Sequence, residues 1–212
     1  MSGTITGLSV QKRDPNRLNI ELDGEFAFGL NRLTAAWLQV GQLLSDKDIK
    51  KLQTEDENEK VYKAALHLLG HRARSSTEMV SRLLQKGFPR EQVEPIINKL
   101  IANGMLNDQE YAESYARDRA AMHPRSQRLI TLELRKKGIT GEEIETILED
   151  LPDDDQLALQ AAKKVMNRWS TTDKKSFENK CAGYLARKGF GYGTISTVMS
   201  IIWQEVQQIN EK

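Results

Sequence analysis

Residues 83–88 have the sequence LLQKGF, and this stretch decides how the whole chain is interpreted. The same pattern, Leu-x-x-Lys-Gly followed by an apolar residue, returns as LRKKGI at residues 134–139 and as LARKGF at residues 185–190, so that each copy begins 51 residues after the one before. Apolar positions downstream of each copy keep the same period. In a chain of 212 residues, a period this long indicates structural repeats packed side by side.

Each repeat is predicted to contain three helices, and the Lys-Gly pair is predicted to end the second one. A glycine just past a helix adopts the left-handed conformation readily, and a cation in the last turn interacts favourably with the helix dipole. We assign this structural role to Gly87, Gly138 and Gly189. Predicted helix starts are Ser75 with Glu78, Asn107 with Glu110, and Thr140 with Glu143.

The first 30 residues alternate apolar and polar side chains, which indicates a three-stranded antiparallel meander. Asp14-Pro15-Asn16 and Asp23-Gly24 are the predicted turns. A sheet this small has to pack on helices, and Trp37, Leu38 and Val40 are candidates for that contact. The charged residues 46–60 are compatible with either a helix or a linker.

We therefore expect a mainly α protein in which three tandem three-helix repeats form an elongated curved array, preceded by the small N-terminal antiparallel β-meander. The expected boundaries are residues 1–58 for the meander with short helices, then 59–107, 108–152 and 153–212 for the three repeats. Stacked repeats provide an extended surface suited to a polymer or filament, rather than one deep catalytic cleft.

The composition, with 39% apolar and 29% charged residues, is typical of a soluble protein. The chain has no apolar run near the ~18 residues that a membrane span needs, and no signal-peptide pattern. A single cysteine fits a reducing compartment, so we expect a cytoplasmic protein. We also expect a monomer without membrane contact. Phosphate-binding, dinucleotide-binding and nucleophile-elbow motifs are absent from the sequence. We expect neither enzymatic activity nor a cofactor.

Three features that resemble chemical sites have simpler structural explanations. His67 and His71 are four residues apart, but two histidines alone do not make a zinc site. Cys181 occupies the repeat position of Met79 and Ile130, so it is predicted to be a core residue. The acidic run at residues 153–155 follows a proline at a helix start and is predicted to supply the helix cap and partners for the helix dipole. No metal site is expected.

The net charge of +1 conceals a recurring segregation of charge. Residues 72–90 carry five basic and one acidic side chain, residues 115–140 seven and two, and residues 163–188 eight and two. Residues 141–155 carry eight acidic and no basic ones. If the repeats stack in one orientation, the basic segments align into a stripe suited to phosphate or to an acidic protein face. Each cluster taken singly is also explained as a solvated helix face.

The basic residues are the remaining candidates for a binding surface, and aromatic residues that would stack on bases are not interleaved with them. The candidates are Arg72, Arg74, Arg82 and Lys86 in the first repeat, Arg117, Arg119, Arg125, Arg128, Arg135, Lys136 and Lys137 in the second, and Lys163, Lys164, Arg168, Lys174, Lys175, Arg187 and Lys188 in the third.

The order and spacing of several phrases resemble the RecX family of bacterial RecA regulators. The phrases are Arg72-Ala73-Arg74-Ser75 with Glu78 and Lys86-Gly87; Gly104-Met105-Leu106-Asn107-Asp108 with Tyr111-Ala112, Tyr115 and Arg119; Arg128-Leu129 with Glu133-Leu134 and Lys137-Gly138-Ile139; and Tyr184-Leu185-Ala186-Arg187-Lys188-Gly189-Phe190. The resemblance covers about residues 61–203, and the N-terminal strands resemble the extension of longer members. His123-Pro124-Arg125 departs from the family, which usually has a glycine before this helix.

The resemblance implies a non-catalytic protein that binds the RecA–DNA filament and suppresses its growth, ATP hydrolysis and strand exchange. The basic residues above are then candidates for contact with RecA or with the phosphate backbone of single- or double-stranded DNA. Two alternatives remain open from the residues alone: a sequence-nonspecific DNA-binding module that does not need RecA, and a helical-repeat scaffold for protein–protein contacts.

Overall fold

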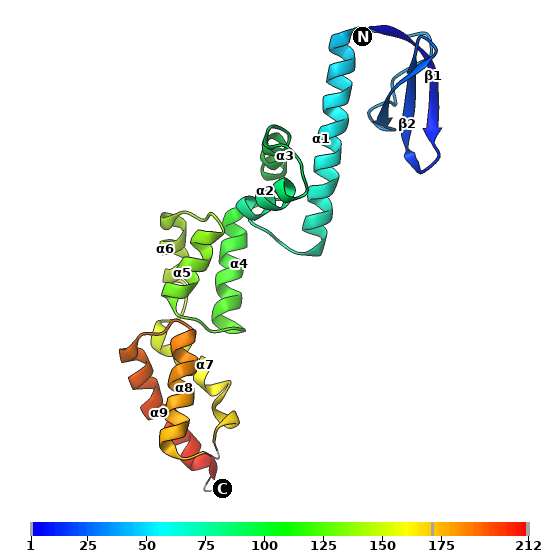
Figure 1. The fold of residues 1–212 in the computed structure, drawn as a ribbon. Helices are drawn as coiled ribbons and strands as arrows, with labels where there is room; N and C mark the ends of the chain where they lie inside the picture. Colours follow the sequence, from blue (N-terminus) through cyan, green and yellow to red (C-terminus); the bar gives the residue numbers. More distant parts are fainter. Residues whose placement is uncertain (1, 171, 211–212) are drawn as a thin grey trace. The chain divides into compact units, whose positions relative to one another are not determined.

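The structure is a computed structural model that describes residues 2–170 and 172–210. The chain divides into two compact units. The first comprises residues 1–73 and 79–105, and the second comprises residues 74–78 and 106–212. Figure 1 shows the strands and the first helices, which belong mainly to the first unit, and the later helices, which belong to the second. Each unit is described by itself.

The first unit begins with an antiparallel sheet whose strand order is β3-β2-β1-β4 (Figure 1). The strands are β1 (Gly3–Gln11), β2 (Asp14–Leu22), β3 (Glu25–Asn31) and β4 (Leu43–Leu44). The predicted meander is therefore correct, and the two-residue strand β4 adds a fourth member that pairs with Gly3 and Thr4.

The Asp23-Gly24 turn is confirmed: Leu22 pairs with Glu25, and both turn residues have positive φ, 51° and 92°. Such a turn matches the right-handed twist of the strands it joins. The first turn was predicted two residues too late, because Gln11 already pairs with Asp14 and leaves Lys12 and Arg13 as the loop.

Residues 46–60, for which a helix or a linker was possible, are helical. They belong to α1 (Asp46–His71), which continues into the predicted first helix of the first repeat. The expectation of short helices before residue 59 is thus corrected. Ser45 and Asp48 form a capping box at its start. The sheet packs its apolar face, including Ile5, Ile20 and Leu30, against Leu52 of α1.

The contact residues predicted for this sheet are only partly right. Leu38 is buried, but Trp37 and Val40 are 56% and 63% exposed. They lie in the loop between β3 and β4, where an apolar residue can be left at the surface without breaking an alternating pattern.

The buried carboxylate of Asp56 on α1 binds residues of the sheet. Asp56 is 3% exposed and accepts a hydrogen bond of 2.6 Å from the backbone N–H of Asn31. Its carboxylate also pairs with Arg17 at 3.1 Å and with Lys60 at 2.8 Å. Burial by itself raises the pKa of Asp56, but the bonds from Lys60, Arg17 and Asn31 outweigh it and hold that pKa below its ordinary value.

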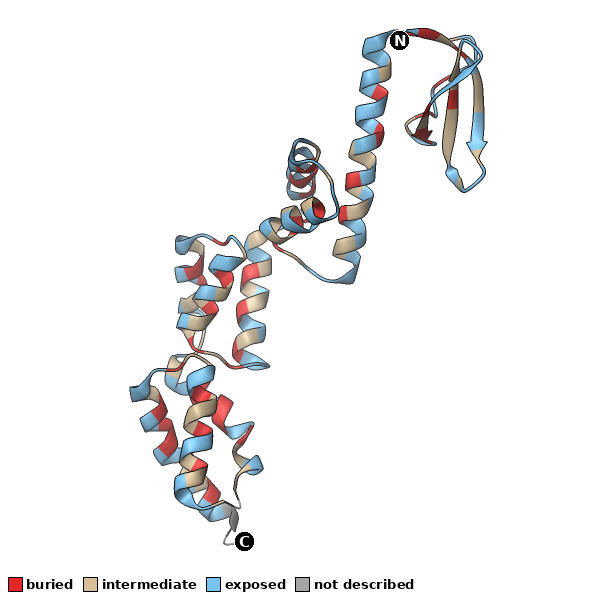
Figure 2. Ribbon diagram, in the orientation of Figure 1, coloured by how far each residue is buried: buried red, intermediate tan, exposed pale blue. Residues whose placement is uncertain are grey.

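The remaining helices form three-helix groups, and buried residues recur along the helices of each group (Figure 2). The first group adds α2 (Ser76–Gln85) and α3 (Arg90–Ala102) to the end of α1; the second is α4 (Asp108–Ala121), α5 (Gln127–Lys136) and α6 (Gly141–Glu149); the third is α7 (Asp154–Lys163), α8 (Lys174–Arg187) and α9 (Tyr192–Asn210). Asn107 and Thr140 cap α4 and α6 as predicted.

The third group departs from the prediction of one first helix over residues 153–169. Helix α7 ends at Lys163, and a 3-10 turn, η1 (Met166–Arg168), follows it. Val165 leaves helical geometry between them, and its side chain is buried in the core of this group. Cys181 lies fully buried in the same core, as predicted, and burial raises the pKa of its thiol to about 11.

The thrice-repeated Lys-Gly pair ends α2, α5 and α8 in the same way. Gly87, Gly138 and Gly189 have φ of 91°, 86° and 92°. After each glycine, the N–H of the next residue donates to the leucine carbonyl five residues earlier, as Phe88 does to Leu83 at 3.3 Å. This is a Schellman motif, which satisfies carbonyls that the helix end leaves open. The predicted structural role of these glycines is confirmed.

Candidate functional site

The candidate basic residues fall into two groups according to their exposure. Side chains of the first group are half-buried and contact other parts of the repeats: Arg74, Arg119, Arg125, Lys137 and Lys188. Those of the second group are exposed: Arg72, Arg82, Lys86, Arg117, Arg128, Arg135, Lys136, Lys163, Lys164, Arg168, Lys174, Lys175 and Arg187. Sequence spacing alone could not separate the two.

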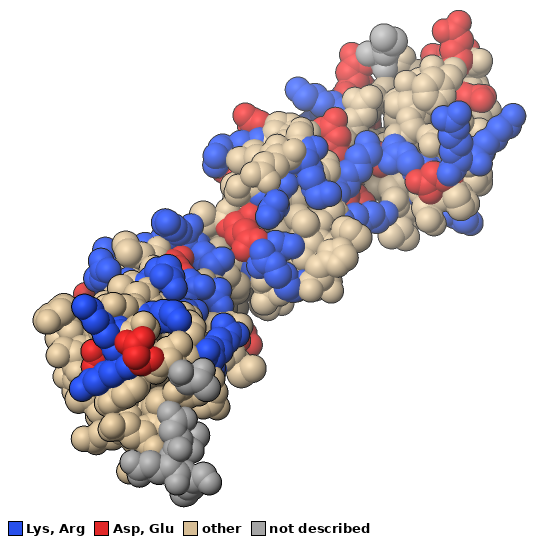
Figure 3. Space-filling view, turned by 60° about the horizontal axis from the view of Figure 1, so that its bottom comes forward, with Lys and Arg blue, Asp and Glu red and all other residues tan. Residues whose placement is uncertain are grey.

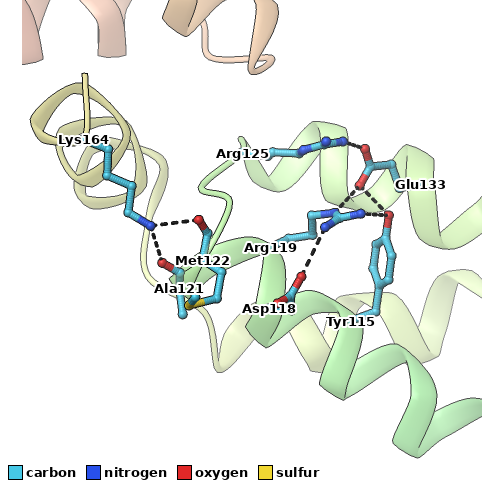
Figure 4. A network of polar contacts seen from close by, with 8 residues as sticks. All are labelled: Tyr115, Asp118, Arg119, Ala121, Met122, Arg125, Glu133 and Lys164. Atoms are coloured by element: carbon cyan, nitrogen blue, oxygen red, sulfur yellow. Dashed lines mark hydrogen bonds and ion pairs between the residues drawn. The ribbon is translucent and has the colours of Figure 1, made fainter. Parts of the chain in front are cut away.

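The arginines of the second repeat that turn inward meet at Glu133 (Figure 4). Glu133 on α5 accepts hydrogen bonds from Tyr115 at 2.8 Å and from Arg119 at 3.2 Å, and its other oxygen pairs with Arg125. The hydroxyl of Tyr115 also accepts from Arg119 at 3.0 Å. This network ties α4 and the following loop to α5, so Arg119 and Arg125 have a structural role here.

Replacing Glu133 by glutamine is expected to lower the free energy of unfolding by about 1–2 kcal/mol, because an amide offers one acceptor oxygen and no charge to two arginines. Urea unfolding followed by far-UV circular dichroism measures the change. Glu113→Gln is the matched control, since Glu113 pairs with Arg117 at the surface at 3.8 Å and such a pair contributes little. Equal effects of the two substitutions would contradict a structural role for the network.

Several exposed cations have no acidic partner. Within the described residues, Arg128, Arg135 and Lys136 on α5 make no ion pair, and the same is true of Lys86, Arg168, Lys175 and Arg187. By contrast, Lys163 pairs with Glu205 at 2.7 Å and Lys174 with Glu178 at 3.9 Å. On the face that Figure 3 shows, basic side chains gather over the C-terminal helical part of the chain.

The same hydrogen bond occurs at both junctions, that is, at the two places where one repeat packs on the next within the second unit. The sequence does not predict it. Asp108 at the start of α4 accepts the backbone N–H of Ser76 at 2.7 Å, and Asp154 at the start of α7 accepts that of Gln127 at the same distance. A first-turn aspartate of each repeat thus caps the second helix of the repeat before it. As predicted for residues 153–155, Asp153 caps α7 and the two following aspartates lie in its first turn; the bond from Gln127 to Asp154 is an additional contact that the sequence does not predict.

Metal and membrane sites find no support in the described part of the chain. His67 and His71 lie on the exposed face of α1 with their Nε2 atoms 3.3 Å apart. No group of three or more possible metal-ligating side chains occurs among residues 2–170 and 172–210. None of the helices described is long and apolar enough to cross a membrane.

Four family models match successive parts of the chain. The model described as "Regulatory protein RecX N-terminal domain" matches residues 3–45, and those described as the first, second and third three-helix domains of RecX match residues 62–100, 107–148 and 153–199. The chain belongs to the RecX family.

Relatives in this family match nearly the whole chain. Regulatory protein RecX of Bacillus pumilus (strain SAFR-032) is 31% identical over 98% of this chain and 81% of its own length. Regulatory protein RecX of Listeria monocytogenes (strain ATCC BAA-679 / EGD-e) is 32% identical over 88% of this chain and 71% of its own length. The RecX membership predicted from the repeated phrases is therefore confirmed.

Solved structures agree with the assignment. The crystal structure of a regulatory protein RecX covers 93% of this chain and 99% of its own, with 29% identity and a TM-score of 0.69. The crystal structure of RecX from Lactobacillus salivarius covers 70% of this chain and 97% of its own, with 32% identity and a TM-score of 0.56. The mainly α fold of this chain, with three RecX helical domains after an N-terminal sheet, is consistent with its similarity to these RecX structures.

Proposed function

We propose that this RecX-family chain is a non-catalytic regulator that binds the RecA–DNA filament and inhibits RecA ATPase, filament growth and strand exchange. It thereby modulates recombination and the SOS response. The observation that carries the proposal is the match to all four RecX family models along the chain. The exposed cations support it, because phosphate contacts supply sequence-independent affinity for a DNA-containing filament.

The test is RecA ATPase on single-stranded DNA, titrated with this protein at two salt concentrations. We expect dose-dependent inhibition below stoichiometric ratios, weaker at the higher salt because exposed charges are screened. ATPase that stays unchanged up to equimolar protein would contradict the proposal. DNA binding by fluorescence anisotropy, measured in parallel, tells whether a chain that fails to inhibit RecA still binds DNA.

A matched pair of charge variants tests the basic surface. The triple variant Arg128→Gln, Arg135→Gln, Lys136→Gln removes three exposed cations of α5 that have no ion pair. The control Lys12→Gln, Lys47→Gln, Lys50→Gln removes three exposed cations of the first unit, which are not among the candidates. Only the first variant is expected to weaken inhibition and DNA affinity. Equal losses would assign the effect to net charge alone.

The same unpaired cations favour a second candidate function, a DNA-binding module that does not need RecA. Under that function the protein binds naked DNA with a steep salt dependence and has no preference for the filament. Comparison of its affinity for naked single-stranded DNA with that for RecA-coated DNA distinguishes the two.

A further inference from the structure

The two junctions of the second unit differ by one carboxylate. With the period of 51, Arg74 corresponds to Arg125 and Glu78 corresponds to Leu129. At the first junction, Glu78 pairs with Arg74 of its own repeat and, at 3.6 Å, with Lys137 from the Lys-Gly turn of the next repeat. The carboxylate thus lies between two cations that two repeats contribute. At the second junction an apolar side chain occupies its position.

The lysine of the second junction is therefore left without an anion. Lys188 corresponds to Lys137 and lies against the start of α5, where its carbonyl accepts the N–H of Ser126 at 3.0 Å. Its Nζ lies 5.4 Å from the centre of the Tyr184 ring. Among the residues that the structure describes, no carboxylate lies within ion-pair distance of Lys188.

Other cations surround this position. Partial burial first, and then the charges of Arg125, Arg119 and Lys164, lower the pKa of Lys188 below its ordinary value. Figure 4 shows that both arginines point toward Glu133, and that Lys164 reaches the carbonyls of Ala121 and Met122, each at 2.8 Å. Glu133 already serves Arg119, Arg125 and Tyr115, so it does not neutralise Lys188.

We propose that the second junction is a binding site for a phosphodiester group of DNA, which pairs with Lys188 near the charges of Arg125 and Lys164, at the position where the first junction holds the carboxylate of Glu78. An incoming anion would relieve the repulsion among these cations. We favour DNA over a lone carboxylate because Arg187, next to Lys188 in the chain, is exposed without an ion pair to any described residue and would suit a polyanion.

This inference deepens the proposed function, since the DNA of the filament would supply the phosphate. A substitution that copies the first junction tests it: Leu129→Glu installs the carboxylate without removing any cation. Leu129→Gln has nearly the same size without the charge and is the matched control. Lys188→Gln removes the central cation of the proposed site. It is the second test of the site if circular dichroism shows that Leu129→Glu does not fold.

The probe is a fluorescein-labelled single-stranded oligothymidine, with affinity measured by anisotropy over a salt series. We expect Leu129→Glu and Lys188→Gln to weaken binding on the order of tenfold relative to Leu129→Gln, as for loss of one charge-assisted contact. The slope of log affinity against log salt should fall by about one, as for the loss of one phosphate contact.

Equal affinity of Leu129→Glu and Leu129→Gln for the probe would contradict the proposed phosphate-binding site. A wild-type protein that does not bind the probe would contradict it as well. A Leu129→Glu variant that keeps DNA affinity but loses RecA inhibition would assign the junction to an acidic protein face and also overturn it. Failure of the proposed function is distinct: wild-type protein would leave RecA ATPase unchanged while Leu129→Glu still lost DNA affinity.

Discussion

Replacing Gly189 by alanine is expected to lower the free energy of unfolding of the C-terminal repeat by about 2–4 kcal/mol. Two costs add. Gly189 has φ of 92°, which an L-residue with a Cβ adopts only under strain. The new Cβ would also lie 2.5 Å from Oγ of Ser126 and 2.9 Å from Cβ of Leu129. Ser126 is fully buried and caps α5 by accepting the N–H of Leu129, so it has little room to move.

The same substitution at Gly87 separates the two costs. Gly87 has nearly the same φ, 91°, but a Cβ there would meet nothing within 4 Å. We expect Gly87→Ala to cost only about 1 kcal/mol, and Gly138→Ala to resemble Gly189→Ala because its Cβ would lie 2.8 Å from Cβ of Thr77. Urea unfolding is followed by tryptophan fluorescence, to which Trp203 in the C-terminal core contributes. A cost at Gly87 as large as at Gly189 would show that backbone strain alone explains the effect.

These glycines show which level of structure the sequence predicts well. A Leu-x-x-Lys-Gly pattern followed by an apolar residue contains all the information for a Schellman turn, since the turn depends only on residues within one helical end. The packing of Gly138 and Gly189 on the preceding repeat depends on residues about 60 positions away. Nothing in the local sequence distinguishes these two glycines from Gly87, so the sequence predicts the same role for all three.

The basic residues show the corresponding limit for the candidate site. Arg119 and Arg128 both lie in the basic segment of the second repeat, and the sequence does not tell them apart. In the structure Arg119 binds Glu133, whereas Arg128 is exposed without an ion pair in the described part of the chain. The phrases Tyr115, Arg119 and Glu133-Leu134 supported the family resemblance, and the structure joins three of these side chains in one network. A carboxylate at 133 within a strongly basic segment was the available indication that some of these arginines are paired internally.

The sequence predicts the hairpin of the N-terminal region, but it does not predict how the sheet is attached to α1. Alternation and the Asp23-Gly24 dipeptide indicate strands and a turn from a few adjacent residues. Asp56 lies in a charged stretch that is compatible with a solvated helix, and only the fold brings Arg17 and Asn31 to it. The buried ion pair between distant residues is therefore a feature that the sequence pattern does not reveal.

Replacing Asp56 by alanine is expected to lower the free energy of unfolding of the first unit by about 2–4 kcal/mol at neutral pH. The substitution leaves the N–H of Asn31 buried without its acceptor and removes the partner of Arg17, whose side chain is 21% exposed. Asp56→Asn is expected to cost less, because an amide oxygen can still accept from Asn31. Hydrogen–deuterium exchange of β2 and β3, measured by mass spectrometry, should reveal a local loss of protection.

The pH dependence gives this prediction a distinctive form. Because the pKa of Asp56 is lower in the folded chain than in the unfolded one, the unfolded state binds the proton more readily. The stabilisation by the carboxylate is therefore complete above the unfolded pKa, about 3.9, and is lost as pH falls through the folded pKa. The difference in unfolding free energy between wild type and Asp56→Asn should stay constant from neutral pH to about pH 5 and shrink below about pH 4. Glu55→Gln, at an exposed neighbour whose only ion pair in the described chain is the surface contact with Lys51 at 4.0 Å, is the control and should show little effect at any pH. A difference for Asp56→Asn that persists unchanged into acid would mean that the size and shape of the side chain, and not its charge, fasten the sheet to α1.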